Sequence, residues 1–253
     1  MKVPFFHVGE TIQGFFKISL STSENVKHRG VFVSIVSNIS DSKRIDEETE
    51  LISKRILDSG QLYGSFSSQF VFDSPQINHT TFFGKTFKLS LHVKVSISRF
   101  LRHDISHYHP IVIINPSITY TPRPPVSMSV VNPYVYCSVL LKRTHFSSEE
   151  SILGNLQIGD VKKPAIDILY LCLRINETFK AMSQSKAYFK YQLLDGTPRP
   201  NTSIPFSINI KPYMLWPNYE SSKFPIKIEY SLEVHMIMLD GTKYMTNQPI
   251  DIH

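Results

Sequence analysis

A proline-rich stretch, Asn115–Pro125 (NPSITYTPRPP), constrains the fold of this 253-residue chain more than any other feature. Its prolines fix φ and remove backbone donors, so neither a helix nor a central strand can run through it. The stretch therefore predicts an extended connector. The segments on its two sides follow one pattern twice, which makes the connector a candidate domain boundary.

Four segments recur in the same order on both sides of the prolines, at offsets of about 135 to 140 residues. A near-constant offset with an unchanged order of segments is typical of internal duplication. The sequence thus predicts two similar domains, residues 1–116 and residues 117–253. The matching pairs are Gly9–Gly14 with Glu149–Gly154, Val26–Ile35 with Val161–Leu171, Ser68–Pro75 with Ile204–Pro212, and Phe87–Ser98 with Ile226–Ile237.

The secondary-structure pattern is mostly that of β-strands. Segments such as KLSLHVKVSIS and KIEYSLEVHMIM alternate apolar and polar residues, and Gly, Pro, Asn and Ser clusters separate them. Many strands without recurrent helices predict an all-β protein with two β-sandwiches of the immunoglobulin-like class. Leu239–Thr242 (LDGT) predicts a hairpin with a type I′ turn, because Asp-Gly suits that turn.

One segment, Arg44–Leu57 (RIDEETELISKRIL), departs from this pattern. Its apolar residues lie at near-helical spacing, and Glu50 and Lys54 form a favourable i,i+4 pair. Gly60 is placed where it can end a helix. The segment therefore predicts one short amphipathic helix in the N-terminal domain, packed on an open end of the sandwich or facing a lipid surface.

Composition limits the classes of function. The net charge of +6 favours anionic partners, but no run of Lys and Arg with interleaved aromatic residues indicates nucleic-acid binding. No apolar run is long enough for a membrane helix, and the start lacks a signal peptide. We therefore expect a protein in the cytosol or on the cytosolic face of a membrane. Cys137 and Cys172 have no metal-ligand spacing and predict two buried thiols.

Candidate catalytic and metal sites are few. The run Arg102–Pro110 (RHDISHYHP) contains His103, Asp104, His107 and His109, which are possible metal ligands. Because the run lies between two strands, a polar hairpin loop without a metal is the expected structure. No GxSxG, CxxC, GxGxxG or GxxxxGK[ST] motif occurs, so we expect no enzymatic activity and no cofactor.

The stretch Tyr188–Ile210 is the candidate partner-binding site. A strand ends at Leu193 and Leu194, Asp195-Gly196 predicts a turn, and the two prolines that follow stiffen the loop. A stiff loop beside two leucines offers a pre-ordered apolar contact. Adjacent strand residues face opposite ways, so one leucine can serve the core and the other the surface, or both can belong to the core.

Several segments resemble the arrestin-like small subunit of retromer, the endosomal coat of the vacuolar protein sorting system. The most specific is YQLLDGTPRPNTSIPFSI, since that family has a tyrosine, two apolar residues and Asp-Gly before a loop that ends in Ser-Ile-Pro. The family carries a further strand before its Gly-Glu motif, and eight residues precede Gly9 here. The other segments that resemble the family are HVGETIQGFFKI, VKHRGVFVSI, ELISKRILDSGQLYGSFSSQFVF, GKTFKLSLHVKVSISR and KFPIKIEYSLEVHMIMLDGTKYM.

The resemblance implies two arrestin-like sandwiches and a non-enzymatic role in cargo sorting on endosomes. It implies that Leu193, Leu194, Asp195 and Gly196 contact a helical-solenoid subunit, and that sorting nexins and cargo tails are further partners. The related subunit of the sister complex, retriever, is a close alternative. An arrestin-domain adaptor for receptor traffic is another, although Pro133-Tyr134 and Pro212-Tyr213 lack the full Pro-Pro-x-Tyr motif through which such adaptors recruit ubiquitin ligases.

Overall fold

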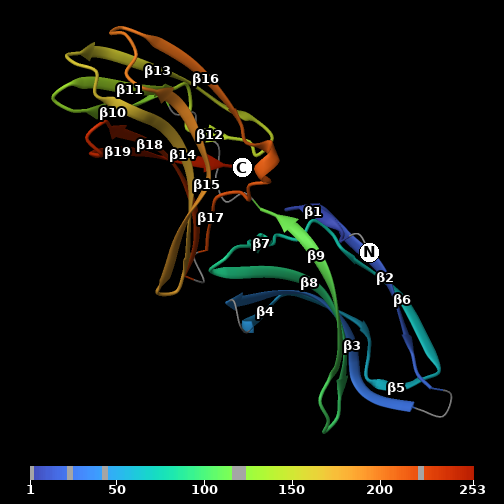
Figure 1. Cartoon of the computed structure of the whole chain (residues 1–253). Coiled ribbons are helices and arrows are strands. Elements are labelled where there is room, and N and C mark those ends of the chain that lie inside the picture. The colour runs from blue at the N-terminus through green and yellow to red at the C-terminus, as the bar shows by residue number, and fades with distance from the viewer. Residues whose placement is uncertain (1–2, 22–24, 42–44, 116–123, 222–224) are drawn as a thin grey trace. The chain divides into compact units, whose positions relative to one another are not determined.

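The chain forms two compact units, Met1–Asn115 and Pro116–His253 (Figure 1). The computed structural model describes residues 3–21, 25–41, 45–115, 124–221 and 225–253. Nearly all regular structure is β-strand, and the one helical turn in the described residues is the 3₁₀ helix η1, Lys211–Tyr213. The predicted all-β class is therefore confirmed. Most of the proline-rich connector, residues 116–123, lies outside the described residues.

The N-terminal unit is a sandwich of a large sheet and a two-stranded sheet. The large sheet has the order β1-β9-β8-β3-β4, with β5 paired to β3 and β7 paired to β8, and the small sheet pairs β2 with β6. The strands are β1 Phe5–His7, β2 Ile12–Ser19, β3 Asn25–Asp41, β4 Ile45–Leu57, β5 Gly60–Tyr63, β6 Ser65–Phe72, β7 Phe82–Phe83, β8 Phe87–Arg99 and β9 Ile105–Ile114.

The C-terminal unit is a sandwich of two larger sheets. One has the order β12-β19-β18-β14-β15, with β17 paired to β18, and the other has the order β10-β11-β13-β16. The strands are β10 Val126–Val131, β11 Val135–Leu141, β12 His145–Phe146, β13 Ser151–Val161, β14 Ile166–Phe179, β15 Met182–Asp195, β16 Ser203–Asn209, β17 Tyr219–Glu220, β18 Ile226–Met238 and β19 Lys243–Ile252.

The two units repeat one strand arrangement. In each large sheet a short first strand runs parallel to the last one (β1 with β9, β12 with β19), and the remaining strands follow in the same order. The small sheets correspond too, because β2 pairs with β6 as β13 pairs with β16. The four segment pairs found in the sequence occupy matching places. In the residues that the structure describes, β10 and β11 of the C-terminal unit have no counterpart in the N-terminal unit.

A glycine under an aromatic ring occurs at the same place in both small sheets. Gly14 lies opposite Phe70 in the β2–β6 pair, and Gly154 lies opposite Phe206 in the β13–β16 pair. A Cβ on Gly14 would come within 2.6 Å of the Phe70 ring, and one on Gly154 within 2.3 Å of the Phe206 ring. Each ring therefore packs on bare backbone, as expected where an aromatic side chain covers a strand glycine.

Each unit has its own apolar core between its sheets. In the N-terminal unit Val31 and Ile97 of the large sheet pack with Phe16 and Ile18 of the small sheet. In the C-terminal unit Cys137 of β11 lies 4.0 Å from Met236 of β18, measured between the sulfur atoms. Both cysteines are buried and free, as predicted, and burial raises the pKa of the Cys137 thiol to about 11.

The helix predicted for Arg44–Leu57 is wrong, because residues 45–57 form strand β4. This strand pairs with β3 along its length, and three register shifts interrupt the pairing. Such bulges reset the inside-outside alternation, so the apolar residues lose their period of two and take on a spacing that imitates a helix. Glu50 accepts a hydrogen bond from the Ser34 hydroxyl, and Lys54 donates one to the Val71 carbonyl, instead of pairing with each other.

The predicted last hairpin is present, but its turn differs from the prediction. Strands β18 and β19 pair from Tyr230 with Ile250 to Ile237 with Lys243. Of the turn residues only Gly241 has a positive φ, +82°, and its N–H donates to the Met238 carbonyl. A type I′ turn needs two positive φ angles, so this is a longer loop that a glycine closes.

The His-rich run is only partly a loop. Residues 100–104 connect β8 to β9, but β9 begins at Ile105, so His107 and His109 lie on a strand. They pair with Val95 and Val93 of β8, and this pairing extends the hairpin further than the polar sequence suggests. Pro110 fits because, among the described residues, β9 has no partner strand on its other edge at this point, so a missing N–H removes no ladder bond there.

Candidate functional site

The predicted partner-binding residues lie at the end of β15, an edge strand of the C-terminal unit. The register places Leu194 opposite Leu169 and Gln192 opposite Tyr170, so Leu193 is the additional residue of a β-bulge. Leu194 is 7% exposed and belongs to the core, whereas Leu193 is only half-buried. The bulge thus separates the two leucines, and Leu193 is the more accessible of the two.

The turn after Leu194 is fixed by hydrogen bonds to the start of β14. Gly196 has φ +81°, which a residue with a side chain adopts at a cost, and its N–H donates to the Asp167 carbonyl at 2.7 Å. The Thr197 hydroxyl oxygen accepts the N–H groups of Ala165 at 2.8 Å and Ile166 at 2.7 Å. These bonds tie the loop to the start of β14.

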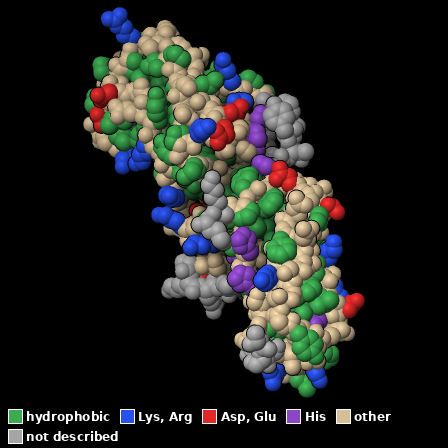
Figure 2. Space-filling view, turned by 90° about the vertical axis from the view of Figure 1, so that its right-hand side faces the viewer, with side chains coloured by type: hydrophobic (Ala, Val, Ile, Leu, Met, Phe, Trp, Pro, Cys, Tyr) green, Lys and Arg blue, Asp and Glu red, His purple; other side chains and the backbone are tan. Residues whose placement is uncertain are grey.

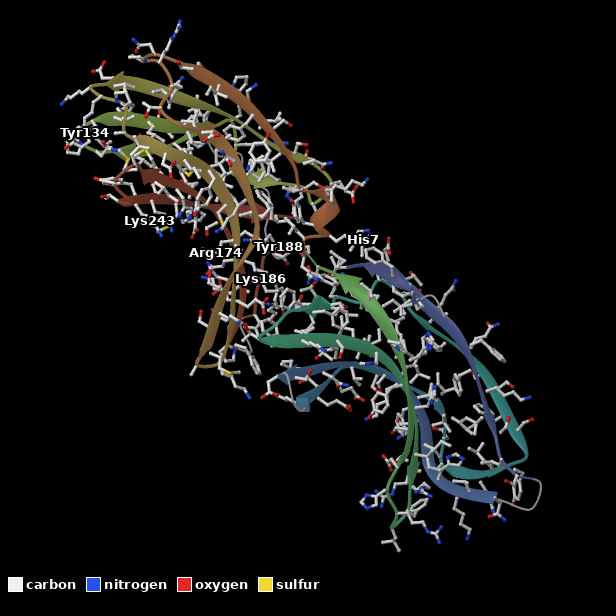
Figure 3. The ribbon with its side chains drawn as sticks, in the orientation of Figure 1. His7, Tyr134, Arg174, Lys186, Tyr188 and Lys243 are labelled. Atoms are coloured by element: carbon white, nitrogen blue, oxygen red, sulfur yellow. The ribbon has the colours of Figure 1, made fainter. Side chains whose placement is uncertain are left out.

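Three further loops meet at this end of the C-terminal unit, which we call the loop end. Leu239, 66% exposed, lies in the β18–β19 turn, and its N–H donates to the Ala165 carbonyl. Tyr134 lies in the β10–β11 turn, with the Lys163 ammonium 3.8 Å from its ring centroid. Figure 3 shows Tyr134 and Lys243 at the same end of the unit. The loop end thus presents separate apolar side chains with cations beside them.

A chain of polar contacts crosses the sheet face near Leu193. The Tyr170 ring stacks on His235 at 4.8 Å, and the Lys190 ammonium lies 5.3 Å from the Tyr170 ring centroid. The Glu233 carboxylate lies 2.8 Å from His235 Nε2 and accepts a hydrogen bond of 2.7 Å from Arg174 Nε. Burial raises the pKa of Glu233, but the bonds from Arg174 and His235 outweigh it and lower the pKa below its usual value.

A possible metal cluster lies in this network rather than in the His-rich run. Cys172, Glu233 and His235 bring their ligand atoms within 4.8 Å of one another. However, both oxygens of Glu233 already bind Arg174 and His235. Burial also raises the pKa of the Cys172 thiol, and a protonated thiol is a poor ligand. The geometry fits an ion-pair network better than a metal centre.

Sequence reasoning missed the residues that support the site. Thr197 follows the recognised Asp-Gly turn, but no local pattern shows that its hydroxyl binds two amides 31 and 32 residues away. The Tyr170–His235–Glu233–Arg174 network spans two strands that are far apart in the sequence. The Pro-Tyr pairs are built into local structure, since Asn132 caps the N–H of Tyr134 and η1 contains Pro212.

Nearly the whole chain resembles a known protein family. Residues 1–241 match the family described as vacuolar protein sorting-associated protein 26. The chain belongs to this family. A family member from Arabidopsis thaliana, vacuolar protein sorting-associated protein 26B, is 24% identical over 266 residues, which cover 99% of this chain and 85% of the relative. The family member from Plasmodium falciparum is 20% identical, over 98% of this chain and 86% of its own length.

Membership of the vacuolar protein sorting-associated protein 26 family confirms the resemblance inferred from the sequence, and the two sandwiches agree with an arrestin-like fold. Among the described residues, no helix is long and apolar enough to cross a membrane.

Proposed function

We propose that this protein is a non-enzymatic subunit of retromer, a cargo-sorting coat of endosomes. Its family, whose members are named for vacuolar protein sorting, supports this assignment. In this proposal the protein binds a helical-solenoid subunit, helps recruit sorting nexins and cargo tails, and associates with the cytosolic face of the endosome through the complex. It needs no cofactor and binds no nucleic acid.

The observation that carries the proposal is the bulge that exposes Leu193 beside a fixed turn. An accessible apolar side chain on a pre-ordered loop loses little entropy on binding. Leu194, Asp195 and Gly196 complete the proposed site in different ways: Leu194 anchors the strand end in the core, Asp195 is exposed, and Gly196 supplies the positive φ. The chain of polar contacts from Lys190 to Arg174 provides a charged rim, which favours one orientation of the partner.

The solenoid fits this site better than a short peptide does. The exposed residues of the loop end come from four connections, β10–β11, β13–β14, β15–β16 and β18–β19. Several loops at one sandwich end can contact the ridges of consecutive helices at once. A partner with repeated helices presents such ridges along its concave or convex surface.

A pull-down from cells tests this proposal. The tagged protein should recover a helical-solenoid subunit of retromer, identified by mass spectrometry, and the Leu193→Asp variant should lose it while remaining folded. Recovery of the solenoid of retriever would assign the chain to the sister complex and overturn the retromer assignment. Recovery of a ubiquitin ligase without any solenoid would support an arrestin-domain adaptor and would equally contradict the proposal.

A further inference from the structure

The tip of the hairpin between β8 and β9 carries two exposed apolar side chains. Leu101 is 100% exposed and Phe100 is 51% exposed. In Figure 1 this hairpin projects from the end of the N-terminal unit. Single apolar residues are common on protein surfaces, but two large ones that follow each other at a projecting tip form a local apolar contact.

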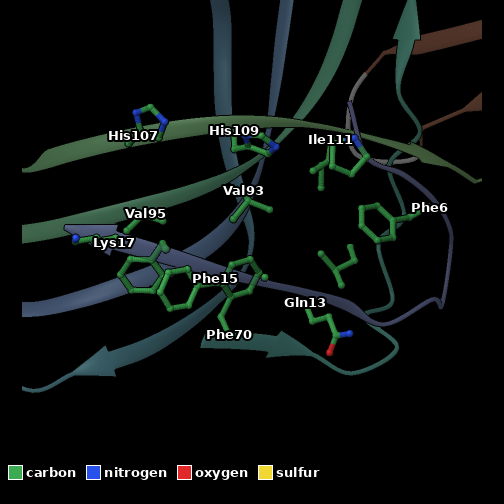
Figure 4. A pocket seen from close by; sticks show the side chains of 14 residues that line it. Phe6, Gln13, Phe15, Lys17, Phe70, Val93, Val95, His107, His109 and Ile111 are labelled. Atoms are coloured by element: carbon green, nitrogen blue, oxygen red, sulfur yellow. The ribbon is translucent and has the colours of Figure 1, made fainter. Parts of the chain in front are cut away.

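The two tip residues take no part in the core. Val93 and Val95 of β8 and Ile111 of β9 line the apolar hollow between β2 and β9, as Figure 4 shows. Phe100 and Leu101 lie in the connection beyond these strand segments and are not part of the lining. Core packing therefore does not explain the apolar tip, at a position where small and polar residues are usual.

Hydrogen bonds close the loop at its base. The Asp104 carboxylate accepts the N–H of Arg99 at 3.0 Å, and Arg99 Nε donates to the His103 carbonyl at 2.7 Å. Between these residues Leu101 has φ +54°, a left-handed conformation that costs energy for a residue with a bulky side chain. Such strain is concentrated at functional sites, and glycine adopts the same conformation without cost. A leucine here therefore indicates a role for its side chain.

Cations surround the apolar tip. The Arg29 guanidinium lies 5.1 Å from the ring centroid of Phe100, and Arg102 is exposed. Asp104 is the only acidic residue of the whole hairpin, residues 87–114, and it is bound within the loop. Figure 2 shows Lys or Arg side chains beside apolar ones at this end of the N-terminal unit. The tip thus combines apolar side chains with an excess of positive charge.

The corresponding turn of the C-terminal unit differs in its charge. That turn joins β18 to β19, and its Leu239 is 66% exposed although β10 and β11 border this unit. Strands at the places of β10 and β11 therefore do not cover a turn at this position. The residue after Leu239 is acidic, Asp240, whereas the residue after Leu101 is basic, Arg102. The turn of the N-terminal unit is thus the better match for an anionic surface.

We propose that this tip docks on an anionic lipid bilayer. Leu101 and Phe100 enter the boundary between headgroups and acyl chains, and Arg29 and Arg102 bind lipid phosphates. A convex tip of two residues buries far less area than a specific protein interface needs, whereas a bilayer surface accepts such a tip anywhere. This contact goes beyond the proposed function, in which the complex brings the protein to the membrane.

Flotation of the full-length protein with vesicles tests the contact. Vesicles of phosphatidylcholine with about one third phosphatidylserine should bind it at millimolar lipid, with an association constant on the order of 10⁴ M⁻¹, as for one myristoyl chain. Vesicles of phosphatidylcholine alone should bind at least about fivefold more weakly, since each basic residue near an anionic surface strengthens binding by about this factor.

Two pairs of variants locate the contact. Leu101→Asp should weaken binding at least about tenfold, because apolar burial is lost and a negative charge is added. Its control, Leu153→Asp, changes a 43% exposed leucine on β13 and should have little effect. Arg102→Glu should weaken binding at least about fivefold, whereas Lys88→Glu, at an exposed lysine near the other end of β8, should have little effect. All four variants must melt at temperatures similar to that of the wild type.

A glycine variant separates a membrane role of Leu101 from a structural one. Because glycine adopts the positive φ without cost, Leu101→Gly should melt at or above the wild-type temperature. It should still lose at least about tenfold in vesicle binding, since the apolar side chain is gone. A lower melting temperature would show that Leu101 packs against the protein instead.

Several results would overturn the proposal. These are equal binding to neutral and anionic vesicles, no binding to either at millimolar lipid, and wild-type binding by Leu101→Asp or Arg102→Glu. If Leu101→Asp lost a protein in pull-downs while its vesicle binding stayed unchanged, the tip would be a protein contact. None of these results bears on Leu193, because the vesicles contain no solenoid subunit.

Discussion

The ionisation of Glu233 has a clear consequence for the stability of the folded protein. It is 5% exposed, and its carboxylate bonds Arg174 and His235. These partners stabilise the ionised form, so the pKa in the folded protein lies below the usual value of 4.5. A lowered pKa means that the folded state gains stability above pH 4.5 and loses this gain as the pH falls through the lower folded value.

We therefore expect Glu233→Gln to destabilise the protein at neutral pH by about 1–3 kcal/mol, as for the loss of a hydrogen bond to a charged group. The difference from the wild type should shrink as the pH falls below 4.5. Melting temperatures measured across this range check it. Glu229→Gln, an exposed carboxylate on the same strand that pairs with Lys227 at 2.9 Å, is the matched control and should have little effect. A constant difference at all pH values would contradict the argument.

The sequence predicted the roles of some residues of the candidate site and not of others. The Asp-Gly turn and the adjacent leucines follow from local chemistry, because glycine permits a positive φ and two apolar residues end a strand. The separate roles of Leu193 and Leu194 could not be predicted, since a bulge depends on the register with β14. Thr197 and Glu233 act through partners distant in the sequence, and one sequence contains no signal for such pairings.

Among the strands, β2 and β13 differ in what lies beside an equivalent glycine. Gly14 and Gly154 occupy equivalent positions, but β11 borders only Gly154. A Cβ on Gly154 would meet both the Phe206 ring at 2.3 Å and the Leu140 carbonyl oxygen at 2.8 Å. The three atoms nearest to a Cβ on Gly14 all belong to the Phe70 ring, which can move because it is a side chain.

Gly154→Ala should therefore cost more stability than Gly14→Ala. Overpacking costs typically about 1–3 kcal/mol, and we expect the upper part of this range for Gly154→Ala and the lower part for Gly14→Ala. Urea unfolding of each variant, with probes in the unit concerned, measures this difference. Gly60→Ala is the control, because its nearest neighbour would be 4.0 Å away. Equal losses at Gly14 and Gly154 would show that no open edge distinguishes the two strands.

Strand β4 shows why elements can be mispredicted from sequence. Intrinsic helical spacing and a favourable charge pair indicated a helix, but pairing with β3 decides the structure. Tertiary pairing commonly overrides local propensity when bulges disturb the alternation. Long alternating strands such as β8 and β18 were predictable because their period of two is uninterrupted over much of their length.

The whole molecule is a pair of sandwiches that repeat one strand arrangement. Duplication was visible in the sequence because four segments kept their order and offset across the prolines. What the sequence could not show is the difference between the halves, since strands β10 and β11 have no counterpart among the described residues of the N-terminal unit. The proposed partner contact, Leu193, lies at the loop end of the second unit.

The affinity for the cognate helical-solenoid subunit, measured by calorimetry, tests the central claim most directly. Leu193→Asp should weaken binding by about thirtyfold or more, because losing a buried anchor typically costs about 2 kcal/mol. Leu153→Asp, a change at a 43% exposed leucine on β13 of the other sheet, should bind as the wild type does, and both variants must match its melting temperature. Unchanged affinity of folded Leu193→Asp would contradict the claim that Leu193 anchors the partner.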